Sequence, residues 1–224
     1  MLYIVATPIG NLEDITYRAV RVLREVDVVL CEDTRVTRTL LAHYDITTPT
    51  RAVHQHTRGA TLVRIVQEFS DGADMALVTD AGTPGLSDPG NQLVAAAVAA
   101  GVTVTPVPGP SALTAAVSIA GVDLQRFAFL AYPPHKKGRQ TFFRRVARFV
   151  AEEKLPVIYY DSVHRVAKNL TLLADTAPDA HIIIARELTK LHEEILRGTA
   201  ADLAAHFAEH PDTLRGEFVV VVYW

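Results

Sequence analysis

The stretch Asp80-Ala81-Gly82-Thr83-Pro84-Gly85-Leu86-Ser87-Asp88-Pro89-Gly90 contains three glycines, two prolines and two carboxylates. It follows the short apolar run 75–78 and precedes a segment of helical spacing that begins near Asn91. Proline lacks a backbone donor and glycine favours turns, so this stretch is neither helix nor strand. Since open α/β sheets bind ligands in the loops beyond their strand ends, the stretch predicts a ligand-binding loop.

Two more loops of the same kind follow apolar runs in the first half of the chain. They are Pro8-Ile9-Gly10-Asn11-Leu12 and Pro108-Gly109-Pro110-Ser111-Ala112. Any one of the three could be an ordinary turn, because glycine and proline mark turns in general. Three such loops in one half of the chain predict a binding site.

The first 120 residues alternate between short β-branched runs and segments of helical spacing. We expect strands at 2–6, 26–31, 75–78 and 102–107, and helices at 15–25, 35–43, 61–69, 92–100 and 112–120. The strand runs are nearly continuous in apolar residues, as in parallel strands covered on both faces. Asp14 and Ser111 stand at helix N-cap positions. The alternation predicts a doubly wound α/β sheet.

Beyond Gly121 the pattern changes, and it predicts a second α/β domain with some antiparallel pairing. Expected strands are 127–130, 157–160, 181–185, 193–197 and 218–223, and expected helices are 139–152, 163–174 and 200–207. We therefore expect an N-terminal doubly wound domain over 1–121 and a C-terminal α/β domain over 126–224.

Composition favours a soluble cytoplasmic protein. Apolar residues make up 49% of the 224, enough for a substantial core. The single cysteine, Cys31, excludes an intramolecular disulfide and fits a reducing compartment. The N-terminus lacks a basic region and a long apolar run, so no signal peptide is expected, and no stretch is long enough to cross a membrane.

The net charge of −3 does not by itself suggest a nucleic-acid partner, but the basic residues are unevenly distributed. Between positions 135 and 148 no acidic residue occurs, and six basic residues are present: Lys136, Lys137, Arg139, Arg144, Arg145 and Arg148. This segment is either a solvated helix face with its loop or a patch that contacts phosphates.

Several common sites are not indicated. Neither a dinucleotide-binding nor a P-loop fingerprint occurs, and the loop at Gly10 has one glycine only, which argues against NAD and ATP. An adenosine ligand without phosphates remains open. His54 and His56 form a close pair without further ligands at zinc spacing, so no metal is expected. There is no nucleophile elbow, and Cys31 at the end of an apolar run predicts an inert thiol.

Charged turns follow the strands in both halves. Glu32-Asp33-Thr34-Arg35 could hold a ribose hydroxyl, orient a nucleotide or cap the next helix. Ala185-Arg186-Glu187-Leu188-Thr189-Lys190 and Arg215-Gly216-Glu217 pose the same question in the second half.

Taken together, these segments resemble the tetrapyrrole methylase superfamily. The resemblance rests first on Thr7-Pro-Ile-Gly-Asn-Leu12, Glu32-Asp-Thr-Arg35, Asp80-Ala-Gly-Thr-Pro84, Asp88-Pro-Gly90 and Pro108-Gly-Pro-Ser111. Tyr160-Asp-Ser-Val-His-Arg165, the turn at 185–190 and the turn at 215–217 resemble its ribosomal RNA branch. Other branches have a glycine-rich GxGxGD loop after the first strand, where this chain has Pro8-Ile9-Gly10. The match runs in order from residue 2 to about 222.

The resemblance implies two α/β domains with a cleft between them that binds S-adenosylmethionine, without a metal, and usually a homodimer. It implies methyl transfer to the ribose 2′-hydroxyl of cytidine 1402 in 16S rRNA of the small ribosomal subunit. Two alternatives stay open: a uroporphyrinogen or precorrin methyltransferase of the same fold, and a ribosome-assembly factor without turnover. The low aromatic content, 7%, disfavours the tetrapyrrole substrate.

The expected site residues follow from these loops. For the cofactor we expect Pro8, Gly10, Asp80, Gly82, Pro84, Ser87, Asp88 and Ser111. The unranked catalytic candidates are Asp33, Asp88, Glu187 and Lys190, with Asp80 as a further base and Arg35 or Arg186 as further cations beside an alkoxide. For RNA phosphates we expect Arg35, Lys136, Lys137, Arg139, Arg144 and Arg145. The chain departs from the family pattern at Asp161, usually glutamate, and at Thr57, usually asparagine.

Overall fold

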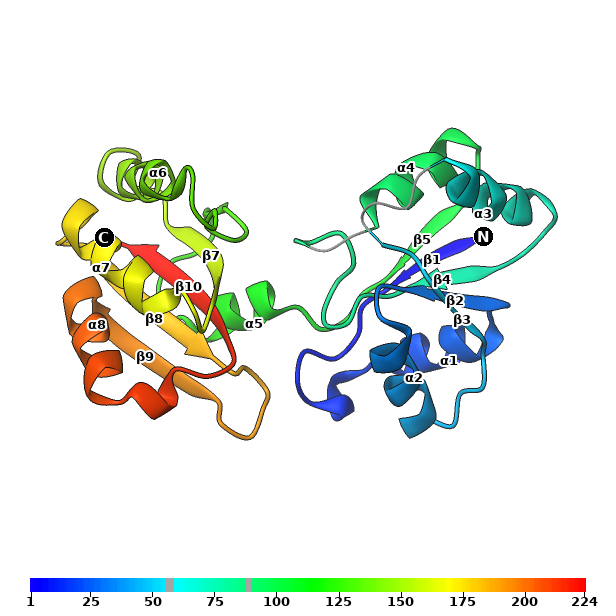
Figure 1. Ribbon diagram of the computed structural model, residues 1–224, viewed down its shortest axis with the longest axis horizontal. Coiled ribbons are helices and arrows are strands. Elements are labelled where there is room, and N and C mark those ends of the chain that lie inside the picture. Colours follow the sequence, from blue (N-terminus) through cyan, green and yellow to red (C-terminus); the bar gives the residue numbers. More distant parts are fainter. Residues whose placement is uncertain (55–58, 88–89) are drawn as a thin grey trace. The chain divides into compact units, whose positions relative to one another are not determined.

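The computed structural model describes residues 1–54, 59–87 and 90–224 (Figure 1). The chain divides into two compact units, Met1–Ser111 and Ala112–Trp224. The sequence places this boundary near 121–126, about ten residues later. The difference arises because helix α5 (Ala112–Ile119) packs against strand β10 (Glu217–Tyr223) and so belongs with the second unit.

The first unit is built on a five-stranded parallel sheet in the order β3-β2-β4-β1-β5. Its strands are β1 (Leu2–Val5), β2 (Val28–Cys31), β3 (Thr50–Ala52), β4 (Met75–Leu77) and β5 (Val104–Val107). All five strands run parallel, so their carboxyl ends lie at one edge of the sheet. Ligands bind at this edge in open α/β folds.

Helices cover both faces of this sheet, which confirms the doubly wound prediction (Figure 1). The helices are α1 (Tyr17–Glu25), α2 (Thr34–His43), α3 (Ala60–Ser70) and α4 (Asn91–Ala99). Val29 and Cys31 pack in one core with α1 and α2, whereas Leu30 between them packs in the other core with α3 and α4. Successive strand residues thus face opposite buried layers, which explains the continuous apolar runs.

The second unit contains a mixed sheet in the order β6-β7-β10-β8-β9. Its remaining elements are β6 (Ala128–Phe129), α6 (Arg139–Ala151), β7 (Val157–Ser162), α7 (Val166–Thr176), β8 (His181–Arg186), β9 (Glu194–Thr199) and α8 (Ala200–Glu209). The expected antiparallel pairing is confirmed, since β10 runs antiparallel to β7 and β8, and β8 to β9. Phe143, Tyr159 and Phe218 lie fully buried in its core.

Two local predictions differ from the structure. Strand β3 was not expected, because its sequence Thr-Arg-Ala has no apolar run and its pairing to β2 comes from the sheet. Helix α1 is capped by Thr16 rather than Asp14, since Thr16 Oγ1 accepts a hydrogen bond from the Ala19 amide at 3.1 Å. Asp14 lies instead in the short 3-10 helix Leu12–Asp14. None of the helices in the described ranges is long and apolar enough to span a membrane.

Candidate functional site

The loops that follow β1 and β4 are joined by a short backbone pairing. The Thr7 amide donates to the Gly82 carbonyl at 2.9 Å, and the Gly82 amide donates to the Thr7 carbonyl at 3.0 Å. The buried Thr7 hydroxyl also donates to the Thr79 carbonyl at 3.1 Å. The two loops therefore form one rigid surface at the carboxyl edge of the sheet.

The loop after β5 joins this surface through close backbone packing. The Thr83 hydroxyl donates to the Pro110 carbonyl at 3.1 Å. Gly82 has a φ of +83°, and a Cβ there would lie 3.4 Å from Ile9 Cγ2. A Cβ at Gly109 would lie 3.1 Å from Ala6 Cβ. Glycine at these two positions therefore lets the three loops pack closely against one another.

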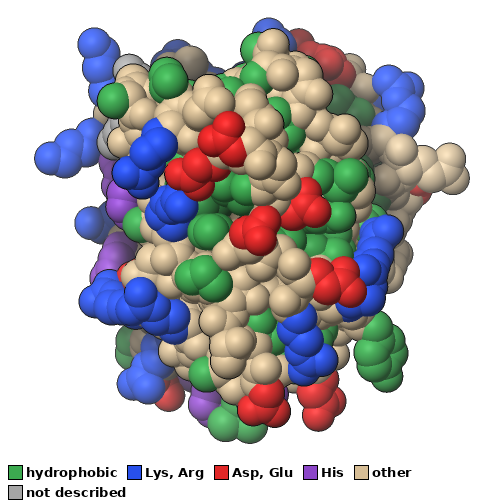
Figure 2. Space-filling view, turned by 90° about the vertical axis from the view of Figure 1, so that its right-hand side faces the viewer, with side chains coloured by type: hydrophobic (Ala, Val, Ile, Leu, Met, Phe, Trp, Pro, Cys, Tyr) green, Lys and Arg blue, Asp and Glu red, His purple; other side chains and the backbone are tan. Residues whose placement is uncertain are grey.

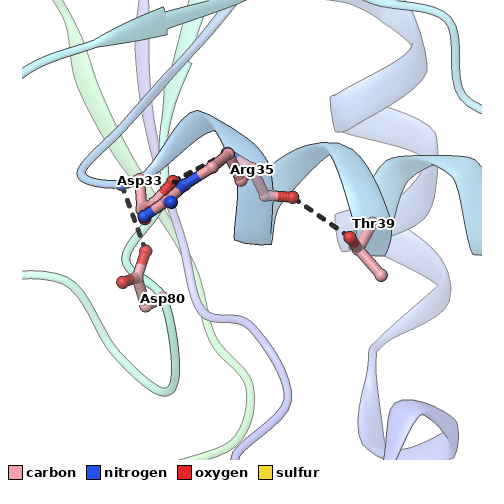
Figure 3. A network of polar contacts seen from close by, with 4 residues as sticks. All are labelled: Asp33, Arg35, Thr39 and Asp80. Atoms are coloured by element: carbon pink, nitrogen blue, oxygen red, sulfur yellow. Dashed lines mark hydrogen bonds and ion pairs between the residues drawn. The ribbon is translucent and has the colours of Figure 1, made fainter.

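Figure 3 shows a polar network at the start of α2 that reaches the loop after β4. The Asp33 carboxylate accepts from the Arg35 amide at 2.8 Å and pairs with Arg35 Nη2 at 2.5 Å. The Asp33 amide donates to Asp80 Oδ1 at 3.2 Å, and one turn along α2 the Thr39 hydroxyl donates to the Arg35 carbonyl. The network brings Asp33, Arg35 and Asp80 together at this edge, as the sequence predicts.

The pKa of Asp33 is lowered from 3.8 to about 2, chiefly by the hydrogen bond from the Arg35 side chain and then by the one from the Arg35 amide. The pKa of Arg35 is raised by the same pairing. A carboxylate held in this way is a weak base at neutral pH. Capping α2 and orienting Arg35 are therefore better suited to Asp33 than accepting a proton.

This pairing makes a titration prediction. The lowered pKa favours the folded state above pH 3.8, and that contribution is lost as the pH falls toward about 2. In Arg35→Gln we expect the pKa of Asp33 to rise toward 3.8, because the side-chain bond that lowers it most is gone. NMR titration of the Asp33 carboxyl in both proteins measures this, and equal pKa values would contradict the pairing.

The expected cofactor residues lie on these loops with different exposures. Pro8, Gly82 and Pro84 are buried, Gly10 and Asp80 are exposed, and Ser111 is half-buried directly before α5. Ser87 is exposed and has a φ of +68°, an uncommon conformation for a residue with a side chain. Asp88, expected in both the cofactor and the catalytic sets, lies outside the described residues, as do His56 and Thr57.

Glu187 and Lys190 form a compact ion cluster with Glu217 in the second unit. Lys190 Nζ lies 2.7 Å from Glu187 Oε1 and 2.9 Å from Glu217 Oε2. The Glu217 amide donates to the same Glu187 oxygen at 3.1 Å. Gly216 permits this approach, because its φ is +82° and a Cβ there would overlap the Glu187 carboxylate.

Burial alone would raise the pKa of Glu187, but hydrogen bonds from Lys190 and the Glu217 amide outweigh it and leave the pKa lowered. Burial likewise acts to lower the pKa of Lys190, and its two carboxylate partners leave that pKa raised. Lys190 therefore stays protonated at neutral pH and can stabilise negative charge. The nearby Arg186 is buried and pairs with Glu194 at 3.0 Å.

Asp161, where the family usually has glutamate, is buried and forms hydrogen bonds within the second unit. Its buried carboxylate accepts from Asn169 Nδ2 at 2.7 Å and from the Ser162 amide at 2.8 Å. Burial raises its pKa, and these hydrogen bonds and the charges of Arg165 and Arg139 oppose the rise. The shorter side chain is thus satisfied within its own unit.

Four residues outside the predicted site set also shape these sites. Thr7, Thr79 and Thr83 lock the loops of the first unit, and Asn169 anchors Asp161. The sequence contains features that could indicate these residues. The threonines stand beside or within the glycine- and proline-rich loops, and Asn169 interrupts an apolar helix face.

The basic segment lies at the start of α6 and in the loop before it. Lys136, Lys137, Arg144 and Arg145 are exposed, whereas Arg139 is half-buried and its guanidinium donates to the Pro134 and His135 carbonyls. Figure 2 shows one face of the molecule, with acidic side chains across its middle and basic side chains gathered toward its left side. Among the described residues, no group of three or more His, Cys, Asp or Glu has metal-site geometry.

The protein thus consists of a doubly wound unit with closely packed loops at its carboxyl edge, followed by a mixed-sheet unit. Residues 1–204 match the model of the tetrapyrrole (corrin/porphyrin) methylases, and the chain belongs to this family. The family predicted from the sequence is therefore confirmed.

More specific similarity comes from curated relatives, each named ribosomal RNA small subunit methyltransferase I. The protein from Xylella fastidiosa strain Temecula1 is 47% identical over 99% of this chain and 80% of its own length. That from Coprothermobacter proteolyticus is 42% identical over 100% of this chain and 97% of its own.

Solved structures of similar fold are more distant in sequence. The methyltransferase CobJ has a TM-score of 0.71 at 19% identity, covering 99% of this chain and 93% of its own. Cobalt precorrin-4 methyltransferase has a TM-score of 0.69 at 20% identity, covering 100% and 94%. At these identities the likeness shows the fold alone, and it confirms the predicted α/β class.

Proposed function

We propose that the protein transfers the methyl group of S-adenosylmethionine to the ribose 2′-hydroxyl of cytidine 1402 in 16S rRNA. The observation that carries this proposal is the 38–47% identity, over at least 99% of the chain, to proteins named ribosomal RNA small subunit methyltransferase I. The solved methyltransferases of similar fold share only 19–20% identity with the chain, so their likeness gives no support to a corrin substrate here.

The loops of the first unit fit S-adenosylmethionine because they expose backbone and one exposed carboxylate. Gly82 and Gly109 let the three loops pack against one another, and the exposed Asp80 carboxylate, bonded to the Asp33 amide, can accept from hydroxyl or ammonium groups of the cofactor. Pro8, Gly10, Pro84, Ser87, Asp88 and Ser111 complete the proposed cofactor set. When bound, the cofactor supplies an electrophilic methyl group on a sulfonium.

The chain's own residues then need to position the ribose hydroxyl and accept its proton. Lys190, kept protonated by Glu187 and Glu217, is the proposed cation beside the ribose oxygen, a role that requires it to turn from one of these carboxylates toward the substrate. The lowered pKa values of Asp33 and Glu187 make both weaker bases, so these residues suit orientation. Asp80 and Asp88 remain the candidates for the proton acceptor.

Basic side chains of the second unit, together with Arg35, would bind RNA phosphates. The proposed set is Arg35, Lys136, Lys137, Arg139, Arg144 and Arg145. Such contacts position an RNA without reading its sequence. We further propose that the protein acts as a homodimer in the cytoplasm, and light scattering of the purified chain tests the dimer.

Neutralising Lys136, Lys137 and Arg139 together is expected to weaken binding to small ribosomal subunits. Each lost phosphate contact reduces the slope of log affinity against log salt by about 0.7–0.9, so the triple variant should lose about 2.1–2.7 units if all three residues contact phosphates. Binding measured at several salt concentrations gives this slope. An unchanged slope would remove the segment from the RNA interface.

A competition between substrate classes tests the proposal as a whole. Labelled S-adenosylmethionine is offered with small ribosomal subunits that lack the ribose methyl, and separately with uroporphyrinogen and corrinoids. We expect label in the subunits only. Label in a tetrapyrrole alone would favour that substrate, and cofactor binding without any transfer would favour a ribosome-assembly factor.

A further inference from the structure

A hollow of about 570 Å³ lies where α6 begins, and basic side chains line it. Lys136 comes from the preceding loop, and Arg139 and Arg144 come from the first turns of α6. Gln140 and Thr141 add polar groups, and Leu172 of α7 adds an apolar wall. Three cationic side chains thus line one hollow of the surface rather than being spread along a flat helix face.

Within the described ranges, no ion pair joins Lys136, Arg139 or Arg144 to a carboxylate. Arg139 is held in place by the Pro134 and His135 carbonyls, so its guanidinium is oriented before any ligand arrives. A preoriented guanidinium loses less side-chain entropy on binding an anion. The hollow therefore combines concentrated positive charge with one fixed donor.

The other basic residues of α6 are engaged differently. The Arg145 guanidinium lies over the Phe149 ring, 5.2 Å from its centroid. That of Arg148 lies 5.6 Å from the same centroid, and its Nε is 3.3 Å from Glu153 Oε1. Neither residue lines the hollow, and neither does Lys137. Neighbours in sequence thus differ in position: Lys136 from Lys137, and Arg144 from Arg145.

We propose that this hollow seats one backbone phosphate of the RNA substrate, held by Lys136, Arg139 and Arg144. The inference rests on the proposed function and refines it. It divides the basic segment into three residues that bind one phosphate and other basic residues that attract the RNA only through their positive charge. Guanidinium groups match the paired oxygens of a phosphodiester, and an apolar wall such as Leu172 suits the adjoining ribose. Such a seat would fix the register of the RNA without contacting a base.

Two matched pairs of variants test the seat. Lys136→Gln is compared with Lys137→Gln, and Arg144→Gln with Arg145→Gln, so that each pair loses the same charge at neighbouring positions. The readouts are affinity for small ribosomal subunits lacking the ribose methyl, its salt dependence, and KM against kcat for methyl transfer. Gln is a good helix former, and circular dichroism monitors folding.

We expect Lys136→Gln and Arg144→Gln each to weaken binding by about tenfold at moderate salt, and Lys137→Gln and Arg145→Gln by about twofold. KM should rise while kcat stays near that of the wild type. Equal losses of affinity within both pairs would contradict the phosphate site. They would show that the basic segment attracts RNA only through its overall positive charge. Because wild-type methyl transfer is measured in the same assay, failure of the proposed function would be seen separately.

Discussion

Replacing Asp80 with alanine is expected to abolish methyl transfer while the fold stays intact. The Asp80 side chain is exposed, and the Asp33 amide is the one hydrogen-bond donor described for it. Loss of this bond costs about 1 kcal/mol of folding free energy, which a folded domain tolerates. A charge-assisted contact to the cofactor is worth about 1.5–3 kcal/mol, or about 10–100-fold in affinity. Transfer should fall at least that far.

Two further variants identify what the Asp80 carboxylate contributes. Asp80→Asn keeps an oxygen that can accept from the Asp33 amide but removes the charge, so it should bind the cofactor poorly while matching the wild type in stability. Asp71→Ala removes an exposed carboxylate at the end of α3, where its partner is Gln67, and should retain full activity. Cofactor affinity by calorimetry and urea unfolding measure both effects. Full activity in Asp80→Ala would remove this loop from the cofactor site.

Replacing Gly216 with alanine is expected to give the largest loss of stability among the loop variants. Its φ of +82° costs a side-chain-bearing residue about 1–2 kcal/mol. The added Cβ would also lie 2.5 Å from Glu187 Cγ, so Glu187 would have to leave Lys190 and the Glu217 amide. Loss of the charged hydrogen bond adds about 1.5–3 kcal/mol. We expect a total decrease of about 2.5–5 kcal/mol in the free energy of unfolding.

Gly121→Ala is the matched control for this effect. Gly121 has a φ of +72° in the same unit, and a Cβ added there would have no other atom within 4 Å. This variant should lose only the backbone contribution, about 1–2 kcal/mol. Urea unfolding of both variants separates strain from displacement of Glu187. Equal losses would show that the Glu187–Lys190 pair contributes no measurable stability.

Much of the fold could be predicted because parallel strands buried on both faces leave continuous apolar runs. The strand at 2–6, for example, is observed as Leu2–Val5, and the helix at 139–152 as Arg139–Ala151. Strand β3 could not be found this way, because its formation depends on pairing with β2. The unit boundary also depends on tertiary packing, since α5 is an uncharged, alanine-rich helix like α4 of the first unit yet packs on β10.

The candidate site could be predicted in part, since loops beyond parallel strands gather at one edge wherever they occur in sequence. In the structure Asp33 and Asp80, from two such loops, lie within hydrogen-bond distance of each other. The sequence could not show that Arg35 forms an ion pair with the Asp33 carboxylate, or that the absence of a Cβ at Gly216 makes room for Glu187. Those features depend on side-chain distances of a few ångströms, which spacing along the chain does not contain.

The most direct test of the account is the position of the transferred methyl group. Small ribosomal subunits lacking the ribose methyl are incubated with the protein and labelled S-adenosylmethionine, and the rRNA is then digested and analysed by mass spectrometry. We predict label on the ribose of a single cytidine, at position 1402 of 16S rRNA. Label on a base, or on no nucleotide despite bound cofactor, would contradict the proposed reaction.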